Sequence, residues 1–240
     1  MTKLRSLLVV LAALTFGVAP FVTPPFSGYD PGIFPVRIER PFIQPAGYAF
    51  AIWSVIYLWL FAHALFGLWK RVDDPAWDRV RLPLTVALAI GTVWLAIAGS
   101  SPIWATITIW IMAVAALTAF LRADTGADRW LLAAPLGIFA GWLSAASAVS
   151  LGVLLAGYGW LGNTGSAAVM LALVLVIAVT VQWRQPRMPV YGLTVIWALC
   201  GVVAVNLTDG QPVAIMAAAG VGVMALVLLA TLRQGTLRPA

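Results

Sequence analysis

Eight apolar stretches, each about long enough to cross a bilayer, constrain this chain more than any other feature. A transmembrane helix needs about 20 apolar residues. The stretches are continuous and lack the alternation, in segments of about ten residues, that is typical of membrane barrels. The sequence therefore predicts an all-α polytopic helical bundle with about eight transmembrane helices, at residues 6–23, 47–69, 83–100, 102–121, 131–157, 164–183, 189–207 and 212–232.

Composition excludes a soluble fold. Hydrophobic residues make up 62% of the 240 residues and charged residues 9%, whereas soluble domains carry about 25% charged residues. The net charge of +6 does not indicate nucleic-acid binding, because the basic residues are dispersed between apolar stretches. Cys200 is the single cysteine, which excludes an internal disulfide.

The distribution of basic residues predicts the orientation. Cytoplasmic loops retain Lys and Arg, and an N-in/C-in topology places only Arg37 and Arg40 outside. This arrangement is typical of a bacterial inner-membrane protein. The other twelve basic residues then lie inside: Lys3, Arg5, Lys70, Arg71, Arg79, Arg81, Arg122, Arg129, Arg184, Arg187, Arg233 and Arg238.

Two features of the predicted spans leave alternatives. Residues 99–102 separate the third and fourth stretches, and Pro102 suits the first turn of a new helix, so a tight turn is expected there. The first stretch follows a short basic segment and resembles either a retained helix or a signal peptide. Pro20, directly after the small residues 17–19, disfavours cleavage.

The first outside loop, residues 24–46, contains six prolines and the aromatic residues Phe26, Tyr29, Phe34 and Phe42. Proline stiffens the loop, and the aromatic rings can pack against the helices. The loop is expected either to cover the bundle as a lid or to lie at the level of the lipid headgroups.

The predicted spans carry little chemistry. All eight acidic residues and all basic residues fall outside them, which disfavours proton relays, ion-coupled transport and enzymes that use paired carboxylates or a metal. No catalytic or metal-binding residue is predicted. His63 is the exception, and it is either a haem ligand or proton handle or, as we favour, a neutral side chain hydrogen-bonded to a neighbouring helix.

Twelve tryptophans are present, and half of them are expected at the membrane interfaces: Trp69, Trp77, Trp104, Trp130, Trp160 and Trp183. Deeper in the second span, Phe50, Trp53 and Tyr57 share one helical face. In the fifth span, Gly137, Gly141, Ser144 and Ala148 form a face of small residues beside Trp142. These two faces either enclose a planar ligand or represent ordinary helix packing.

The segment 43–57 resembles the tryptophan-rich sensory protein family, TspO and the translocator proteins. Pro45 lies in a loop that runs into a helix, and Tyr57 follows Trp53 by four residues, as in that family; Phe50 comes one place later than expected. The segment 135–145, with Trp142 before a run of small residues, is similar to the last helix of the family unit.

The resemblance covers roughly residues 5–158 and implies a five-helix unit, which divides the chain into a TspO-like unit at 1–160 and a three-helix extension at 161–240. The family binds porphyrins, sterols and synthetic apolar ligands in a pocket under the first loop, and it is often dimeric. By this resemblance Trp53, Tyr57 and Trp142 line that pocket, together with Phe50 and Trp94. Where the family often carries Asn, this chain has Thr92 and Ser150 among its polar residues.

The predicted function is a multi-pass inner-membrane protein that binds, carries or senses a planar apolar molecule such as a porphyrin. The expected partners are the lipid bilayer, this ligand and a second copy of the chain. No cofactor is predicted, since a porphyrin or haem would be a ligand. The alternatives are a transporter of a small neutral solute and a ligand-free structural subunit; an enzyme is not expected.

Overall fold

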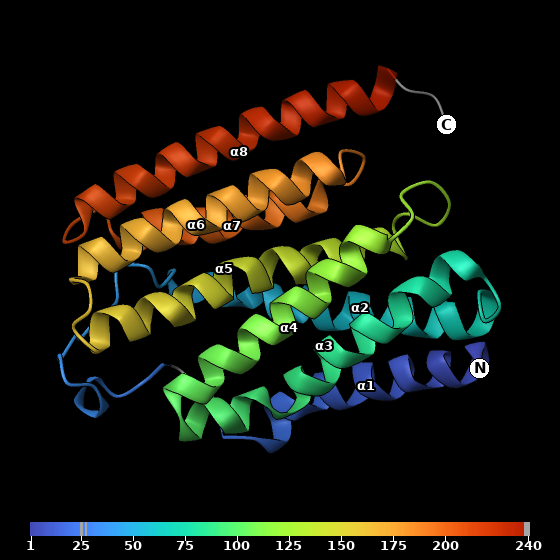
Figure 1. The fold of residues 1–240 in the computed structure, drawn as a ribbon, viewed down its shortest axis with the longest axis horizontal. Helices are drawn as coiled ribbons and strands as arrows, with labels where there is room; N and C mark the ends of the chain where they lie inside the picture. Colours follow the sequence, from blue (N-terminus) through green and yellow to red (C-terminus); the bar gives the residue numbers. More distant parts are fainter. Residues whose placement is uncertain (25, 27, 238–240) are drawn as a thin grey trace.

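The computed structural model describes residues 1–24, 26 and 28–237, and the regular secondary structure of this part is entirely helical. The predicted fold class, a polytopic all-α bundle, is therefore confirmed (Figure 1). Two short 3-10 segments, η1 at Pro31–Ile33 and η2 at Gly47–Ala51, lie between the first two helices. The eight α-helices are α1 Thr2–Val22, α2 Ile52–Lys70, α3 Pro75–Ser100, α4 Pro102–Arg122, α5 Ala133–Gly157, α6 Asn163–Arg184, α7 Val190–Val205 and α8 Gln211–Leu237.

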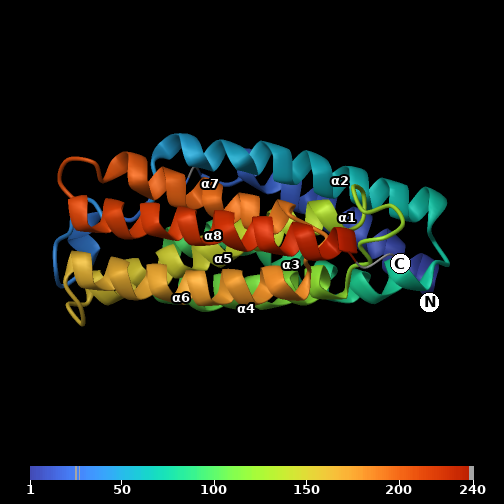
Figure 2. The same ribbon diagram turned by 90° about the horizontal axis from the view of Figure 1, so that it is seen from above.

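The helix axes lie roughly along the long axis of the bundle, and the chain passes back and forth along it (Figures 1 and 2). Seven spans among the described residues are long and apolar enough to cross a membrane, and α7, with 16 residues, is shorter. The N-terminus and the C-terminal end of α8 lie at the same end of the bundle, as an even number of crossings requires. We call this the terminal end and the opposite one, where residues 28–46 lie, the loop end. Which end faces the cytoplasm stays a prediction, and Arg238 lies outside the described residues.

Helix α3 begins eight residues before the predicted span. Asp74 caps its start, because the carboxylate accepts a hydrogen bond of 2.8 Å from the backbone N–H of Ala76. Pro83 lies inside the helix. Because α3 starts before the predicted span, Asp78 and Arg79, which were expected in a loop, fall on its first turns, and Arg81 is buried.

The predicted break between the third and fourth spans is confirmed. Helix α4 starts at Pro102, as expected for a residue whose missing N–H needs no partner in the first turn. The hydroxyl of Ser101 accepts a hydrogen bond of 3.4 Å from the backbone N–H of Trp104 and so caps the new helix. A tight turn therefore joins α3 and α4 at the loop end.

Helix α5 is the centre of the bundle. It packs against α2, α4, α6 and α7. Of its most apolar stretch 61% is buried inside the bundle, compared with 28–44% in the other membrane-spanning helices. Its small residues permit this crowding: a Cβ atom at Gly141 would lie 2.7 Å from the carbonyl oxygen of Tyr191 and 2.9 Å from the Cβ of Thr194, both on α7. The small-residue face of α5 is therefore mainly a helix-packing surface against α7, and only Ala148 of that face reaches the cavity described below.

The last three helices pack directly on the preceding ones. Both α6 and α7 contact α5, and α8 packs against α6 and α7 on the outside (Figure 1). Gly192 of α7 continues this close packing, because the backbone N–H donates a hydrogen bond of 3.1 Å to the Gln182 side chain of α6. The division at residue 160 into a TspO-like unit and an extension stays a prediction.

Candidate ligand-binding site

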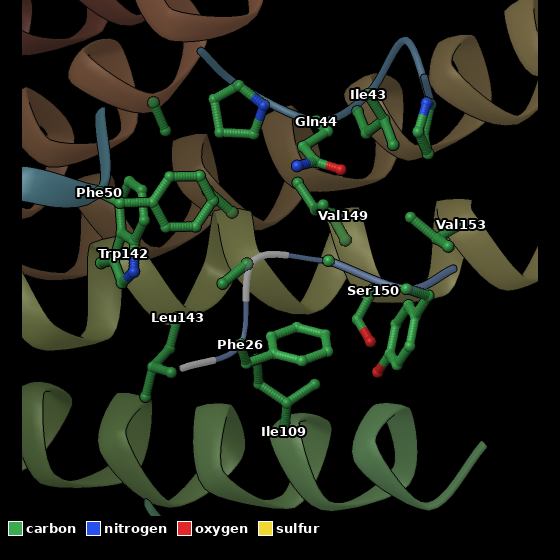
Figure 3. Close-up of a pocket in the computed structure, with 18 of the residues that line it drawn as sticks. Phe26, Ile43, Gln44, Phe50, Ile109, Trp142, Leu143, Val149, Ser150 and Val153 are labelled. Atoms are coloured by element: carbon green, nitrogen blue, oxygen red, sulfur yellow. The ribbon is translucent and has the colours of Figure 1, made fainter. Parts of the chain in front are cut away.

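A cavity of about 740 Å³ lies at the loop end, beneath residues 26–45 (Figure 3). Residues from α1 to α7 line it, so it is enclosed by most of the bundle. Its volume falls within the range of roughly 300–1,000 Å³ that is typical of small-molecule sites. The walls are mainly aliphatic and aromatic, and the charged lining residues within the described chain are Glu39 and Arg40.

Four of the five predicted site residues form one aromatic cluster with Phe16, which we call the inner cluster. Trp53 and Tyr57 are stacked, with ring centroids 5.5 Å apart and 19° between the planes. Phe16 meets the edges of both rings, Trp142 lies 6.1 Å from Trp53, and Phe50 lies 5.6 Å from Trp142. Such contacts fix the rings relative to one another and leave flat faces for a ligand.

The fifth predicted residue, Trp94, lines another part of the same cavity. Its indole N–H donates a hydrogen bond of 3.0 Å to the carbonyl of Ala105, which orients the ring. Phe26 of the first loop packs against it at 5.8 Å and against Tyr29 at 4.9 Å. The structure thus brings all five predicted residues to one cavity; their role in binding stays a prediction.

Two contributions to the walls were not predicted. Phe16 of α1 lies against Gly91 of α3, where a Cβ atom would be 2.5 Å from the ring; the pairing of a glycine with an aromatic across two spans gives no signal in the sequence. Helices α6 and α7 also supply aliphatic wall residues, and such residues look like any lipid-facing position: Leu171, Val174, Val195, Ala198, Leu199 and Val202.

The first loop forms the roof of the cavity, as the lid hypothesis predicted, and its second half is hydrogen-bonded to the helices. We call residues 36–46 the anchored segment. The N–H of Val36 donates to Gly157 of α5 and the N–H of Ala46 donates to Gly201 of α7, at 2.9 and 3.0 Å. Phe42 lies between two amide side chains: its N–H donates to Asn163 and its carbonyl accepts from Asn206, at 2.8 and 2.7 Å.

Residues 28–34, which we call the flap, are held differently. The hydrogen bonds of the flap found in the described chain are local ones between its own residues, such as the bond of 2.8 Å from the N–H of Gly32 to the carboxylate of Asp30. The flap meets the bundle through the ring of Phe34, which lies 5.9 Å from Tyr158 and against Gly157 of α5. Within the flap, the rings of Phe34 and Tyr29 are 5.9 Å apart. The roof therefore consists of an anchored half and a half held by ring contacts.

Two polar atoms at the cavity are buried without a hydrogen-bond partner in the described part of the chain. They are the indole nitrogen of Trp142 and the hydroxyl of Tyr29. Burial raises the pKa of Tyr29 to about 12, so its hydroxyl stays protonated at neutral pH and is able to donate. Buried polar groups are usually paired, which makes these two atoms candidates for contact with a ligand.

The residues at the terminal end form a separate, structural cluster. Trp77, predicted at a membrane interface, is buried, which corrects that prediction. Its ring stacks on His63 at 4.8 Å, and its indole N–H donates to Asp128, whose carboxylate also binds Arg71 at 2.6 Å. The hydrogen bond from Arg71 holds the pKa of Asp128 below its usual value. Here the dense packing removes Trp77 from the lipid interface.

His63 belongs to that cluster and not to the cavity. Its Nδ1 lies 2.7 Å from the carbonyl oxygen of Leu131, just before α5. We favoured a hydrogen bond to a neighbouring helix over a haem ligand, and the partner found is a carbonyl in the turn before α5. Within the described residues no group of three or more His, Cys, Asp or Glu side chains is placed to hold a metal ion.

These features define a polytopic helical membrane protein with a ligand-sized aromatic cavity under its first loop. A family model described as "TSPO-like protein" matches residues 6–230, and the chain belongs to this family. The match extends from α1 into α8, well beyond the five spans on which the resemblance was based. Neither a curated protein nor a solved structure matches the chain.

Proposed function

We propose that this chain binds a planar apolar small molecule, such as a porphyrin, in the cavity at the loop end. The observation that carries the proposal is the inner cluster, in which the stacked rings of Trp53 and Tyr57 and the nearly perpendicular ring of Trp142 line one cavity of about 740 Å³. A flat aromatic ligand gains both apolar burial and ring contacts there. The protein would act as a binding, carrying or sensing protein and not as an enzyme.

The construction of the roof supports a route for the ligand. The anchored segment is hydrogen-bonded to α5, α6 and α7, whereas the flap rests on ring contacts. Movement of the flap would therefore admit a ligand without breaking the bundle. We place the protein in the bacterial inner membrane with the terminal end in the cytoplasm, because the Lys and Arg residues gather at that end.

Titration of the detergent-purified protein with protoporphyrin IX, followed by tryptophan quenching, tests the proposal. Trp53→Phe and Trp142→Phe remove two walls of the inner cluster but keep an aromatic ring. Trp160→Phe is the matched control, because Trp160 is 70% exposed and lies outside the cavity lining. We expect saturable quenching that both cavity variants weaken about 3- to 10-fold and that the control leaves unchanged.

Linear, non-saturating quenching that none of the three substitutions alters would contradict the proposal. The aromatic residues would then be packing residues only. The remaining candidates, a transporter of a small neutral solute or a ligand-free subunit, would take its place. A carrier of that kind should still load a labelled neutral solute into vesicles, which a ligand-free subunit would not do.

A further inference from the structure

Several polar groups of the cavity lie away from Phe50 and Trp142 of the inner cluster. Figure 3 shows Gln44 and Ser150 beside Val149 and Val153, away from the inner cluster residues Phe50 and Trp142. The hydroxyl of Tyr29 is buried in the same lining. A ligand that reaches beyond the inner cluster therefore meets further hydrogen-bonding groups, among them the Tyr29 hydroxyl.

Tyr29 holds its hydroxyl in a defined place. The ring contacts Phe26 at 4.9 Å and Phe34 at 5.9 Å, in both cases edge to face. The hydroxyl is buried and has no partner among the described residues. A buried donor without an acceptor costs free energy, so its retention in an otherwise apolar wall is explained if a bound molecule supplies the acceptor.

Ser150 does not compete with Tyr29 as a hydrogen-bond donor to a ligand, because its own hydroxyl proton is already used. Thr106 has one hydroxyl proton, which it donates to the carbonyl of Pro102 at 2.9 Å in its own helix. In the 2.7 Å contact between the Thr106 and Ser150 hydroxyls, Ser150 is then the donor. Its proton is used, and only its lone pairs face the cavity.

Gln44 adds a second donor near Tyr29. Its amide nitrogen would lie 4.0 Å from a Cβ atom at Gly28, the residue before Tyr29. No hydrogen bond of the Gln44 side chain is found in the described part of the chain. Gln44 lines the same cavity, so its amide is available to a ligand independently of Tyr29.

We propose that Tyr29 is a specificity-determining residue, whose hydroxyl donates a hydrogen bond to an acceptor oxygen on a planar apolar ligand. The inference rests on the proposed function and narrows its ligand class: the ring system lies at the inner cluster, and a carbonyl or carboxylate oxygen points to the flap. Because Tyr29 belongs to the flap, a ligand with this oxygen also holds the flap closed.

The test compares two fluorescent probes that differ in one acceptor, pyrene and 1-acetylpyrene. Binding is followed by energy transfer from tryptophan in the detergent-purified protein. Tyr29→Phe keeps the ring contacts and removes the hydroxyl. Tyr158→Phe is the matched control, because Tyr158 touches the flap at Phe34 but does not line the cavity. All variants are measured in one detergent, so partitioning of the probes into micelles cancels.

We expect Tyr29→Phe to weaken binding of 1-acetylpyrene about 3- to 10-fold, the effect of one neutral hydrogen bond, and to leave pyrene within about twofold of the wild type. The control should change neither. Retained binding of pyrene shows that the variant is folded. Equal effects on both probes, or none on either, would overturn the role of Tyr29 while leaving the cavity proposal standing. Failure of both probes to bind the wild-type protein saturably would overturn both proposals.

Discussion

The flap and the anchored segment belong to the same proline-rich loop, yet they are attached to the bundle by different interactions. Phe42 of the anchored segment exchanges two hydrogen bonds with Asn163 and Asn206, and Ala46 is bonded to Gly201. The flap has a local turn at Asp30 and aromatic contacts. Sequence composition does not reveal this contrast, since both halves are rich in proline and aromatic residues.

The two kinds of attachment, hydrogen bonds and ring contacts, indicate which part of the roof can move. Hydrogen bonds to buried amide side chains define one position of the backbone, because breaking them leaves polar groups unpaired. Ring contacts contribute about 0.5–1.5 kcal/mol each and can be exchanged for contacts with a ligand ring. The anchored segment therefore positions the roof, and the flap is the part expected to open.

The largest effect on stability is expected from Asn206, which holds the anchored segment in place. Asn206 is fully buried; its amide donates to the carbonyls of Phe42 and Val202 and accepts a hydrogen bond of 3.1 Å from Arg40. Asn206→Ala leaves these partners unpaired, so we expect the free energy of unfolding to fall by about 2 kcal/mol. Thermal unfolding in detergent measures the change, and hydrogen exchange should accelerate at Phe42 and Ala46.

Thr208→Ala is the control for that variant, because Thr208 is exposed in the same turn. It should leave the unfolding midpoint unchanged. Faster exchange confined to the flap in Asn206→Ala, with Phe42 and Ala46 still protected, would reverse the assignment of the two halves.

A smaller effect is expected from ionisation of Tyr29. Burial raises the pKa of Tyr29 to about 12, compared with about 10 in water. The closed flap thus favours the neutral phenol, and this preference is lost as the pH rises from about 10 to 12.

If opening exposes the phenol fully, the open population should rise about tenfold at pH 11. Stopped-flow release of bound pyrene, compared at pH 9 and pH 11, measures this rise. Tyr29→Phe should abolish the Tyr29-dependent part of the acceleration. An equal acceleration in wild type and variant would show that the flap does not respond to this residue.

The sequence predicted the helices and part of the site, each for its own physical reason. Apolar runs identify spans because lipid exposure imposes composition, and helical spacing placed Trp53 and Tyr57 on one face. The start of α3 was missed because Pro83 and the charges before it resemble a loop. The position of Trp77 was wrong because the same residue type serves at an interface and in a packed cluster.

The walls from α6 and α7 could not be predicted for a different reason. Val195 and Leu199 line the cavity, but their side chains are no different from those that face lipid. Their role depends on α7 packing against α5, which Gly141 permits. Such a contact between distant segments is a tertiary property that no local pattern contains.

We propose that a ligand reaches the cavity by movement of the flap while the anchored segment stays in place. A disulfide can lock each half in turn, in a Cys200→Ser background. A Cβ atom at Gly157 would lie 3.1 Å from that of Phe34, and one at Gly201 would lie 2.9 Å from that of Pro45. Disulfide Cβ atoms are typically about 3.5–4.5 Å apart, so a small adjustment permits both bridges.

The most direct measurement is the rate of pyrene entry and release in these two locked proteins, with and without reductant. Oxidised Phe34→Cys/Gly157→Cys should exchange pyrene at least about tenfold more slowly than its reduced form, since the ring contacts it replaces are worth about 1 kcal/mol each. Oxidised Pro45→Cys/Gly201→Cys should exchange at its reduced rate. Unchanged exchange with the flap locked would contradict the account and indicate entry between the helices from the lipid.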